Sequence, residues 1–243
     1  MTLNIAHRGY SGAYPENTMP AFEAAVDAGA DGVEFDVQFS KDGALVIMHD
    51  ETVDRTTDGK GFVKDHTLAE LKSLDASAAF KGKYGIVRVP TLEEYLKRVK
   101  GLDFLTNIEL KTGVFEYDGI ESAVTELVRR YGLQDRVIIS SFNHYSVLRA
   151  KAAAPEIRCG FLTETWILNA GAYTRSHGIE CWHPHWASVT KETAAELKEN
   201  GIAVNVWTVN EPDEALRLQS LGVDAVIGNY PEKIGKALRG EYN

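Results

Sequence analysis

Cysteine is scarce in this sequence, and its spacing fits no metal or redox motif. Only Cys159 and Cys181 occur among 243 residues, and each lies in an apolar run. They form neither a C-x-x-C pair nor a zinc-type pattern, which argues against a zinc site. Nothing marks the chain for secretion, so we predict two buried free thiols in place of a disulfide.

Long hydrophobic runs are also missing. No segment approaches the roughly 18 consecutive apolar residues that a bilayer-spanning helix needs. Met1 leads almost directly into an apolar strand, without the basic region and long apolar region of a secretory signal. We therefore expect a cytoplasmic protein that makes no stable membrane insertion.

Positive charge is in short supply. Lys and Arg number 26 against 35 Asp and Glu, which gives a net charge of -9. A chain this acidic is a poor general surface for nucleic acid or for an anionic membrane. Any anionic substrate must therefore be bound by a few local cations.

What the chain does have is a regular alternation of strand-like and helical segments. The eight predicted strands are residues 3–7, 32–39, 104–110, 136–140, 157–162, 179–182, 203–207 and 224–227, with an extra short strand at 44–48. Eight such units in one chain predict an α/β fold, the (β/α)8 or TIM barrel. A doubly wound sheet is the alternative, but no G-x-G-x-x-G turn follows the first strand.

The alternation breaks between residues 51 and 90. This segment is rich in turns and too short to build a hydrophobic core of its own. We therefore expect a single catalytic domain, residues 1–243, with a small inserted subdomain at residues 51–90 that follows the second strand.

Polar capping residues mark several predicted helix starts. Thr67 and Thr91 are each followed three residues later by Glu, which is the pattern of a capping box. Asn143 and Asn210 are predicted N-caps of two later helices.

The strand at residues 32–39, GVEFDVQF, carries the most informative pattern. Its apolar and polar residues alternate, so Glu34 and Asp36 share one face at a separation of roughly 6 to 7 Å. Such a face either meets bulk water, which is the ordinary case for eight residues alone, or holds a cation. The neighbouring strand ends favour the cation.

In a TIM barrel the active site lies at the C-terminal ends of the strands. The chemically active or bulky residues predicted there are His7, Arg8, Glu34, Asp36, His49, Glu109, Lys111, Phe142, His183 and Trp207. Convergence of Glu34, Asp36 and Glu109 would make an all-oxygen site that suits Mg²⁺ or Ca²⁺ better than zinc. The alternative is a structural ion network in which these acids pair with Arg8 and Lys111.

His7 and His49 are the candidates for proton transfer, because imidazole titrates near neutral pH. Asp50, the next residue in the chain, is a candidate to orient His49. Arg8 and Lys111 are the candidate cations for a substrate anion, since the guanidinium fork suits phosphate.

Aromatic residues and two further histidines complete the candidate set. Phe142 and Trp207 are either core residues or a wall against the carbon skeleton of a ligand. For His183 and His185 we favour a structural or loop role, because an H-x-H pair alone is a weak metal signal.

Eight short motifs follow one another in a specific order. They are His7-Arg8-Gly9, Pro15-Glu16-Asn17-Thr18, Glu34-Phe35-Asp36-Val37, His49-Asp50, Arg55-Thr56-Thr57, Pro90-Thr91-Leu92-Glu93-Glu94, Glu109-Leu110-Lys111 and Val206-Trp207-Thr208-Val209. Taken together, this set resembles the glycerophosphodiester phosphodiesterase family over nearly the whole chain. The segment from about residue 145 to 185 carries little of the pattern.

The resemblance implies a TIM barrel that binds one divalent cation, Mg²⁺ or Ca²⁺, through the positions matching Glu34, Asp36 and Glu109. It implies hydrolysis of small glycerophosphodiesters, such as glycerophosphocholine and glycerophosphoethanolamine, to sn-glycerol 3-phosphate and an alcohol. His7 and His49 match the acid/base pair of the family. Arg8 and Lys111 match its phosphate-side cations.

Several questions stay open at this point. The nucleophile is either water or the 2-hydroxyl of the glycerol, and the order of the two histidines, the preferred alcohol, the metal and the oligomeric state are not fixed. A phospholipase D acting on lysophospholipids is an alternative function, although no aromatic and basic loop argues for it beyond Trp166 and Ile167. A non-catalytic phosphodiester-binding barrel is the other alternative, but a binding protein has no use for a proton-transfer pair.

Overall fold

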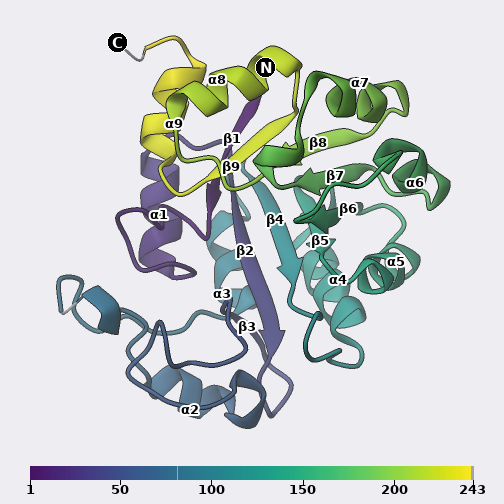
Figure 1. Ribbon diagram of the computed structural model, residues 1–243. Helices are drawn as coiled ribbons and strands as arrows, with labels where there is room; N and C mark the ends of the chain where they lie inside the picture. The colour runs from purple at the N-terminus through teal and green to yellow at the C-terminus, as the bar shows by residue number, and fades with distance from the viewer. Residues whose placement is uncertain (81, 242–243) are drawn as a thin grey trace.

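The computed structural model describes residues 1–80 and 82–241, with strands gathered at the centre and helices outside them (Figure 1). Its strands are β1 (Leu3–His7), β2 (Gly32–Phe39), β3 (Leu45–Ile47), β4 (Leu105–Leu110), β5 (Val137–Ser141), β6 (Arg158–Thr163), β7 (Cys181–Pro184), β8 (Ala203–Val206) and β9 (Ala225–Gly228). Among these described strands, only β3 runs antiparallel to its neighbour. The others follow the order β1-β9-β8-β7-β6-β5-β4-β2, and β1 also pairs with β2. The sheet therefore closes, and the predicted TIM barrel is confirmed.

Helices lie outside the barrel, and most of them connect successive parallel strands. They are α1 (Met19–Asp27), α2 (Leu68–Ser73), α3 (Leu92–Val99), α4 (Ile120–Tyr131), α5 (His144–Ala153), α6 (Ala170–Ser176), α7 (Lys191–Glu199), α8 (Pro212–Leu221) and α9 (Pro231–Leu238). Single 3-10 turns lie at η1 (Val63–Asp65), η2 (Ala78–Phe80), η3 (Gln134–Arg136) and η4 (Trp186–Ser188). Within the described ranges, no helix has both the length and the apolar character needed to cross a membrane. The cytoplasmic location stays a prediction.

Three of the four predicted caps are confirmed. The side chains of Thr67 and Thr91 each take part in a complete capping box, and Asn143 accepts a hydrogen bond from a backbone N–H in the first turn of α5. The prediction for Asn210 is wrong, because Glu211 is the N-cap of α8. The Asn210 side-chain oxygen instead accepts a hydrogen bond from the backbone N–H of Asn229, which ties two loops at the barrel mouth.

Helix α6 is shorter than the predicted segment, residues 167–177. The residue before it, Asn169, has a φ of 56° in the left-handed region, which a continuing α-helix does not allow. Residues 166–168 therefore form a loop, and their apolar side chains are exposed.

The alternation in β2 decides which side chains enter the barrel. Phe35 points outward, where its ring lies 5.4 Å from Phe22 of α1 and 4.5 Å from Tyr95 of α3, measured between centroids. Burial of Phe35 against these two rings fixes the register of the strand, because a slip of one residue would turn Phe35 into the barrel. Glu34 and Asp36 consequently face the interior, with 4% and 0% of their surface exposed. A water-facing strand is thereby excluded.

Residues 51–80 and 82–90 lie beyond the C-terminal end of β2, around α2 (Figure 1). Val53, Val63 and Leu71 from this segment pack with Val46 and Met48 in a small hydrophobic cluster separate from the main core. Strand β3 joins the segment to β2 through antiparallel pairing. The division into one domain with this insertion stays a prediction.

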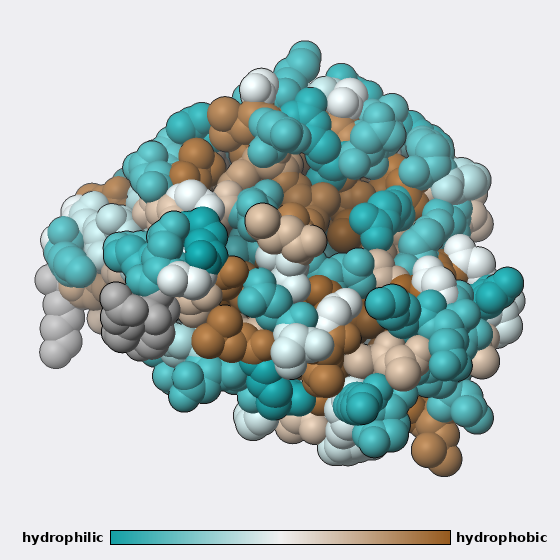
Figure 2. Space-filling model, turned by 90° about the horizontal axis from the view of Figure 1, so that it is seen from above, coloured by the Kyte–Doolittle hydropathy of each residue, from teal (hydrophilic) through white to brown (hydrophobic). Residues whose placement is uncertain are grey.

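Figure 2 shows the molecule from above, where hydrophilic residues cover much of the face and hydrophobic ones lie between them. Scattered apolar surface of this kind is ordinary for a folded domain.

Candidate active site

Three carboxylates meet inside the barrel at the C-terminal ends of two neighbouring strands. Asp36 of β2 is in register with Glu109 of β4, and Glu34 lies one inward-facing position before Asp36. One carboxylate oxygen from each residue lies within 4.8 Å of the other two. All three are buried, and the Oδ1 atom of Asp36 is buried without a hydrogen-bond partner. This oxygen-rich, underbonded cluster fits a hard divalent cation.

The electrostatics of the cluster also fit a cation. Burial, together with the charges of Asp36 and Glu109, raises the pKa of Glu34 well above its usual range. Burial and the charge of Asp36 raise the pKa of Glu109 as well. Burial acts in the same direction on Asp36, but Arg8 and Lys111 outweigh it and lower the pKa of Asp36 to about 2. The three acids therefore oppose one another, and added positive charge would relieve the repulsion.

Arg8 and Lys111 balance only part of this negative charge. The Nε atom of Arg8 lies 3.5 Å from Asp36 Oδ2. The Nζ atom of Lys111 lies 2.9 Å from Glu109 Oε1 and 3.7 Å from Asp36 Oδ1. Across residues 1–80 and 82–241, no lysine or arginine nitrogen makes an ion pair with Glu34. A purely structural ion network would leave this carboxylate without a lysine or arginine in direct ion-pair contact, although the backbone N–H of Arg8 donates a hydrogen bond to its Oε2 at 3.2 Å.

His7 is held by an amide at the end of the last barrel strand. Its Nδ1 lies 2.7 Å from Asn229 Oδ1, which also accepts a hydrogen bond from the hydroxyl of Ser11 at 3.1 Å. Because an amide oxygen only accepts, Nδ1 carries the proton and Nε2 has the free lone pair. Nε2 lies 3.8 Å from Glu34 Oε2. Burial, with a smaller effect from Arg8, lowers the pKa of His7 to about 4, so the ring is neutral at pH 7.

His49 follows β3 and is held by a carboxylate. Its Nδ1 lies 2.7 Å from Asp50 Oδ1, so the structure places Asp50 where the predicted orienting residue should be. Asp50 in turn accepts hydrogen bonds from Arg55, at 2.6 Å and 2.9 Å. Hydrogen bonds from Arg55 lower the pKa of Asp50 below its usual range against the opposing effect of burial. A charged Asp50 keeps the proton of His49 on Nδ1 and leaves Nε2 for chemistry.

One cavity of about 320 Å³ collects most of the candidate residues. Its lining includes His7, Arg8, Glu34, His49, Asn107, Glu109, Phe142, Glu164, His183 and Trp207. The rings of Phe142 and Trp207 lie edge to face at 5.5 Å. Asp36 and Lys111 are not part of this lining. Lys111 instead contacts the carboxylates of Asp36 and Glu109, as given above.

Several residues at the site had no predicted role. Asn17 donates a hydrogen bond from Nδ2 to Asp36 Oδ2 at 2.8 Å, which orients that carboxylate. Asn229 directly follows β9, so the rule of strand ends that identified His7 could have found it. Glu16 and Arg55 belong to quoted motifs, but their contacts with each other join segments 39 residues apart.

His183 and His185 differ in their surroundings. His183 is fully buried at the barrel interior, with Nε2 3.1 Å from Asn205 Nδ2. Burial, followed by the charge of Arg158, lowers the pKa of His183 to about 3. His185 caps η4 by accepting a hydrogen bond from the backbone N–H of Ala187.

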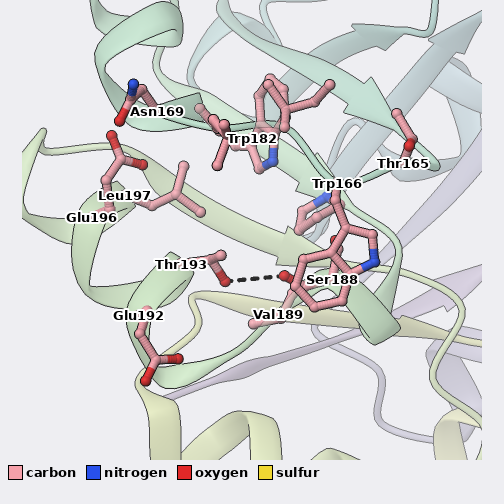
Figure 3. A pocket seen from close by; sticks show the side chains of 14 residues that line it. Thr165, Trp166, Asn169, Trp182, Ser188, Val189, Glu192, Thr193, Glu196 and Leu197 are labelled. Carbon is pink, nitrogen blue, oxygen red and sulfur yellow. Dashed lines mark hydrogen bonds between the residues drawn. The ribbon is translucent and has the colours of Figure 1, made fainter.

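A second hollow lies between α6, α7 and the ends of β6 and β7, and its lining includes Trp166, Trp182, Val189 and Leu197 (Figure 3). Thr193 at its edge donates a hydrogen bond to the carbonyl oxygen of Ser188. The hollow is mainly apolar and contains neither a histidine nor a cationic side chain. It therefore offers no imidazole and no cationic side chain to an anionic phosphate.

Comparisons with known proteins give one consistent result. The model of the glycerophosphoryl diester phosphodiesterase family matches residues 7–233. A glycerophosphodiester phosphodiesterase of Caldanaerobacter subterraneus is 43% identical over 238 residues, which cover 98% of each protein. A phosphodiesterase from Oleispira antarctica, solved in complex with the product sn-glycerol-3-phosphate, is 35% identical with a TM-score of 0.89, over 97% of this chain and 96% of that one. The glycerophosphodiester phosphodiesterase of Agrobacterium tumefaciens is 28% identical with a TM-score of 0.85, over 96% of this chain and 99% of that one.

Proposed function

This chain belongs to the glycerophosphoryl diester phosphodiesterase family, and we propose that it hydrolyses small glycerophosphodiesters to sn-glycerol 3-phosphate and an alcohol. One observation carries the proposal. A single cavity is lined by two carboxylates of the buried acidic cluster, by His7 and His49, and by Arg8. Such a set can bind a phosphate diester, neutralise its charge and move protons on both sides of it.

Glu34, Asp36 and Glu109 would hold one divalent cation, Mg²⁺ or Ca²⁺. When bound, such an ion supplies positive charge to the non-bridging phosphate oxygens as negative charge develops on them. Arg8 adds a guanidinium at the same cavity, which suits a phosphate oxygen. Lys111 holds Glu109 in place and adds positive charge behind it.

The two imidazoles divide the proton transfers between them. Hydrolysis forms a new P–O bond to the nucleophile and breaks the P–O bond to the alcohol. One imidazole accepts the proton of the nucleophile, and the other protonates the oxygen that leaves. The asparagine at His7 and the aspartate at His49 fix both Nδ1 protons, so each ring works through Nε2. Water and the glycerol 2-hydroxyl both fit this division as nucleophile.

Other residues that line the same cavity suit a positively charged alcohol. Phe142 and Trp207 present aromatic surface there, and the exposed carboxylate of Glu164 stands on the rim. Aromatic rings with a nearby carboxylate bind ammonium groups favourably. Glycerophosphocholine and glycerophosphoethanolamine are therefore the proposed substrates.

A coupled assay for glycerol 3-phosphate tests this function. The protein is first depleted of metal with a chelator and then incubated with a panel of glycerophosphodiesters. Mg²⁺ or Ca²⁺ is added back in separate reactions. We expect release of glycerol 3-phosphate that requires added metal and is fastest with the choline and ethanolamine diesters. Binding of the diesters without metal-stimulated turnover would instead identify a phosphodiester-binding barrel.

A lysophospholipase D activity is the second candidate, and one observation favours it. The loop of Trp166, Ile167 and Leu168 exposes 61%, 42% and 91% of these side chains and borders the apolar hollow of Figure 3. That hollow could receive an acyl chain. Lysophosphatidylcholine would release choline and lysophosphatidic acid, so the comparison measures choline, which both substrates release. A higher kcat/KM for lysophosphatidylcholine than for glycerophosphocholine by choline release would support this candidate over the first.

A further inference from the structure

Arg55 in the insertion joins two carboxylates from different parts of the chain. It donates two hydrogen bonds to Asp50, at 2.6 Å and 2.9 Å, and two to Glu16, at 2.9 Å and 2.7 Å. Glu16 also accepts a hydrogen bond from Arg8 at 3.0 Å, and Asp50 contacts His49 Nδ1 at 2.7 Å. A continuous chain of alternating charges therefore runs from Arg8 through Glu16, Arg55 and Asp50 to His49.

The contacts of Arg55 are too exposed to have much value for folding. Its side chain is 48% exposed, against 27% for Asp50 and 22% for Glu16. Ion pairs with this exposure typically contribute only about 0 to 1 kcal/mol to stability. A planar fork that binds both oxygens of a carboxylate nevertheless fixes the rotation of that carboxylate.

The orientation of Asp50 matters because of what its Oδ1 atom does. This one oxygen accepts hydrogen bonds from both His49 Nδ1 and Arg55 Nη2. Without Arg55, Asp50 would stand at a half-exposed turn with one partner and could rotate away from the imidazole. Arg8, at the other end of the chain of contacts, does not depend on Arg55 in this way, because its contact with Asp36 does not involve Arg55.

We infer that Arg55 is a positioning residue that acts through Asp50 to hold the His49 imidazole in its working tautomer and direction. This inference rests on the proposed function, in which His49 transfers a proton. It makes the insertion part of the active site, because the residue that orients the imidazole comes from residues 51–90.

A double-mutant cycle between Arg55→Gln and His49→Ala tests the inference, with glycerophosphocholine and added metal. Partners that orient a metal-ligating imidazole are commonly worth about 10- to 100-fold, and we expect a similar magnitude for the imidazole of His49. We expect R55Q to lower kcat by at least about tenfold with little change in KM. In the H49A background, where no imidazole remains to be oriented, R55Q should change kcat by less than about twofold.

Two further variants complete the experiment. Arg55→Lys keeps the charge but not the fork, so its kcat should lie between those of R55Q and the wild type. Arg98→Gln is the matched control, because Arg98 makes a surface pair with Glu23 at 3.1 Å and is 45% exposed. It should leave kcat unchanged, and thermal unfolding should show all variants folded.

The possible outcomes separate this inference from the proposed function. Normal kcat in R55Q or R55K, or an equal loss from R55Q with and without His49, would overturn the role of Arg55 while the enzyme remains a phosphodiesterase. A wild-type protein that releases no glycerol 3-phosphate from any diester would overturn the proposed function itself.

Discussion

His7 and His49 have the same side chain but different surroundings. His7 is buried against a neutral amide, and its pKa falls to about 4. His49 stands 30% exposed beside the charged carboxylate of Asp50. The two rings therefore reach the cavity from different surroundings, one buried beside Glu34 and the other partly exposed beside Asp50.

Removing either imidazole should stop turnover without removing the metal. We expect His7→Ala and His49→Ala each to lower kcat for glycerophosphocholine by at least about two orders of magnitude, since a general acid or base commonly contributes this much. Metal affinity should stay near that of the wild type, because neither imidazole belongs to the acidic cluster. Steady-state kinetics and metal titration of the purified variants give both quantities.

Near-normal turnover in either variant would remove the mechanism with two histidines. His177→Gln is a suitable control, because His177 is an exposed histidine on the outer surface at the end of α6.

At the scale of single elements, much of the fold follows from local sequence pattern. The period of two in GVEFDVQF predicts the bounds of β2 and the inward face of Glu34 and Asp36, because burial of Phe35 on the other face leaves one register. The capping boxes at Thr67 and Thr91 also predict two helix starts from local sequence. Each box satisfies the unpaired N–H groups of its helix with side chains that lie within four residues.

Other features depend on contacts that no local pattern contains. Asparagine is a common N-cap residue, but the side-chain oxygen of Asn210 accepts a hydrogen bond from the backbone N–H of Asn229 in a distant loop instead. Asn229 reaches His7 across 222 positions of the chain. The pairing of Arg55 with Glu16 likewise requires the insertion to fold back over the barrel.

The packing of β6 against β7 leads to a prediction about pH and stability. A Cβ atom at Gly160 would lie 2.4 Å from His183 Nε2, so the missing side chain makes room for a fully buried imidazole. Burial lowers the pKa of His183 from 6.5 to about 3. Between these two pH values the unfolded chain binds the proton and the folded chain does not, so His183 destabilises the fold as pH falls.

The effect of His183 should be measurable as the slope of the free energy of unfolding against pH. One such group alters the free energy of unfolding by at most about 1.4 kcal/mol per pH unit. Denaturant unfolding of His183→Gln between pH 6.5 and 4 should show a shallower loss of stability than the wild type, while His177→Gln should not. An unchanged slope in H183Q would show that His183 is not held neutral.

At the scale of the whole molecule, closure of the barrel is what assembles the site. The pairing of β1 with β2 places His7 beside Glu34, and the pairing of β2 with β4 places Asp36 beside Glu109. The chain is acidic overall, with a net charge of -9, so Arg8 and Lys111 stand out as the cations at this mouth. Charge on the rest of the surface contributes little to holding an anion.

The central claim is that acids from two strands bind one divalent ion beside a proton-transfer pair. Isothermal titration calorimetry of the metal-depleted protein with Mg²⁺ and with Ca²⁺ tests this claim most directly. The variant Glu109→Gln removes the carboxylate that β4 contributes. Glu126→Gln, at an exposed position on α4, is the matched control. We predict one ion per chain in the wild type and in E126Q, and at least about tenfold weaker binding in E109Q. Equal binding by E109Q and the wild type, or no binding by the wild type, would contradict the account.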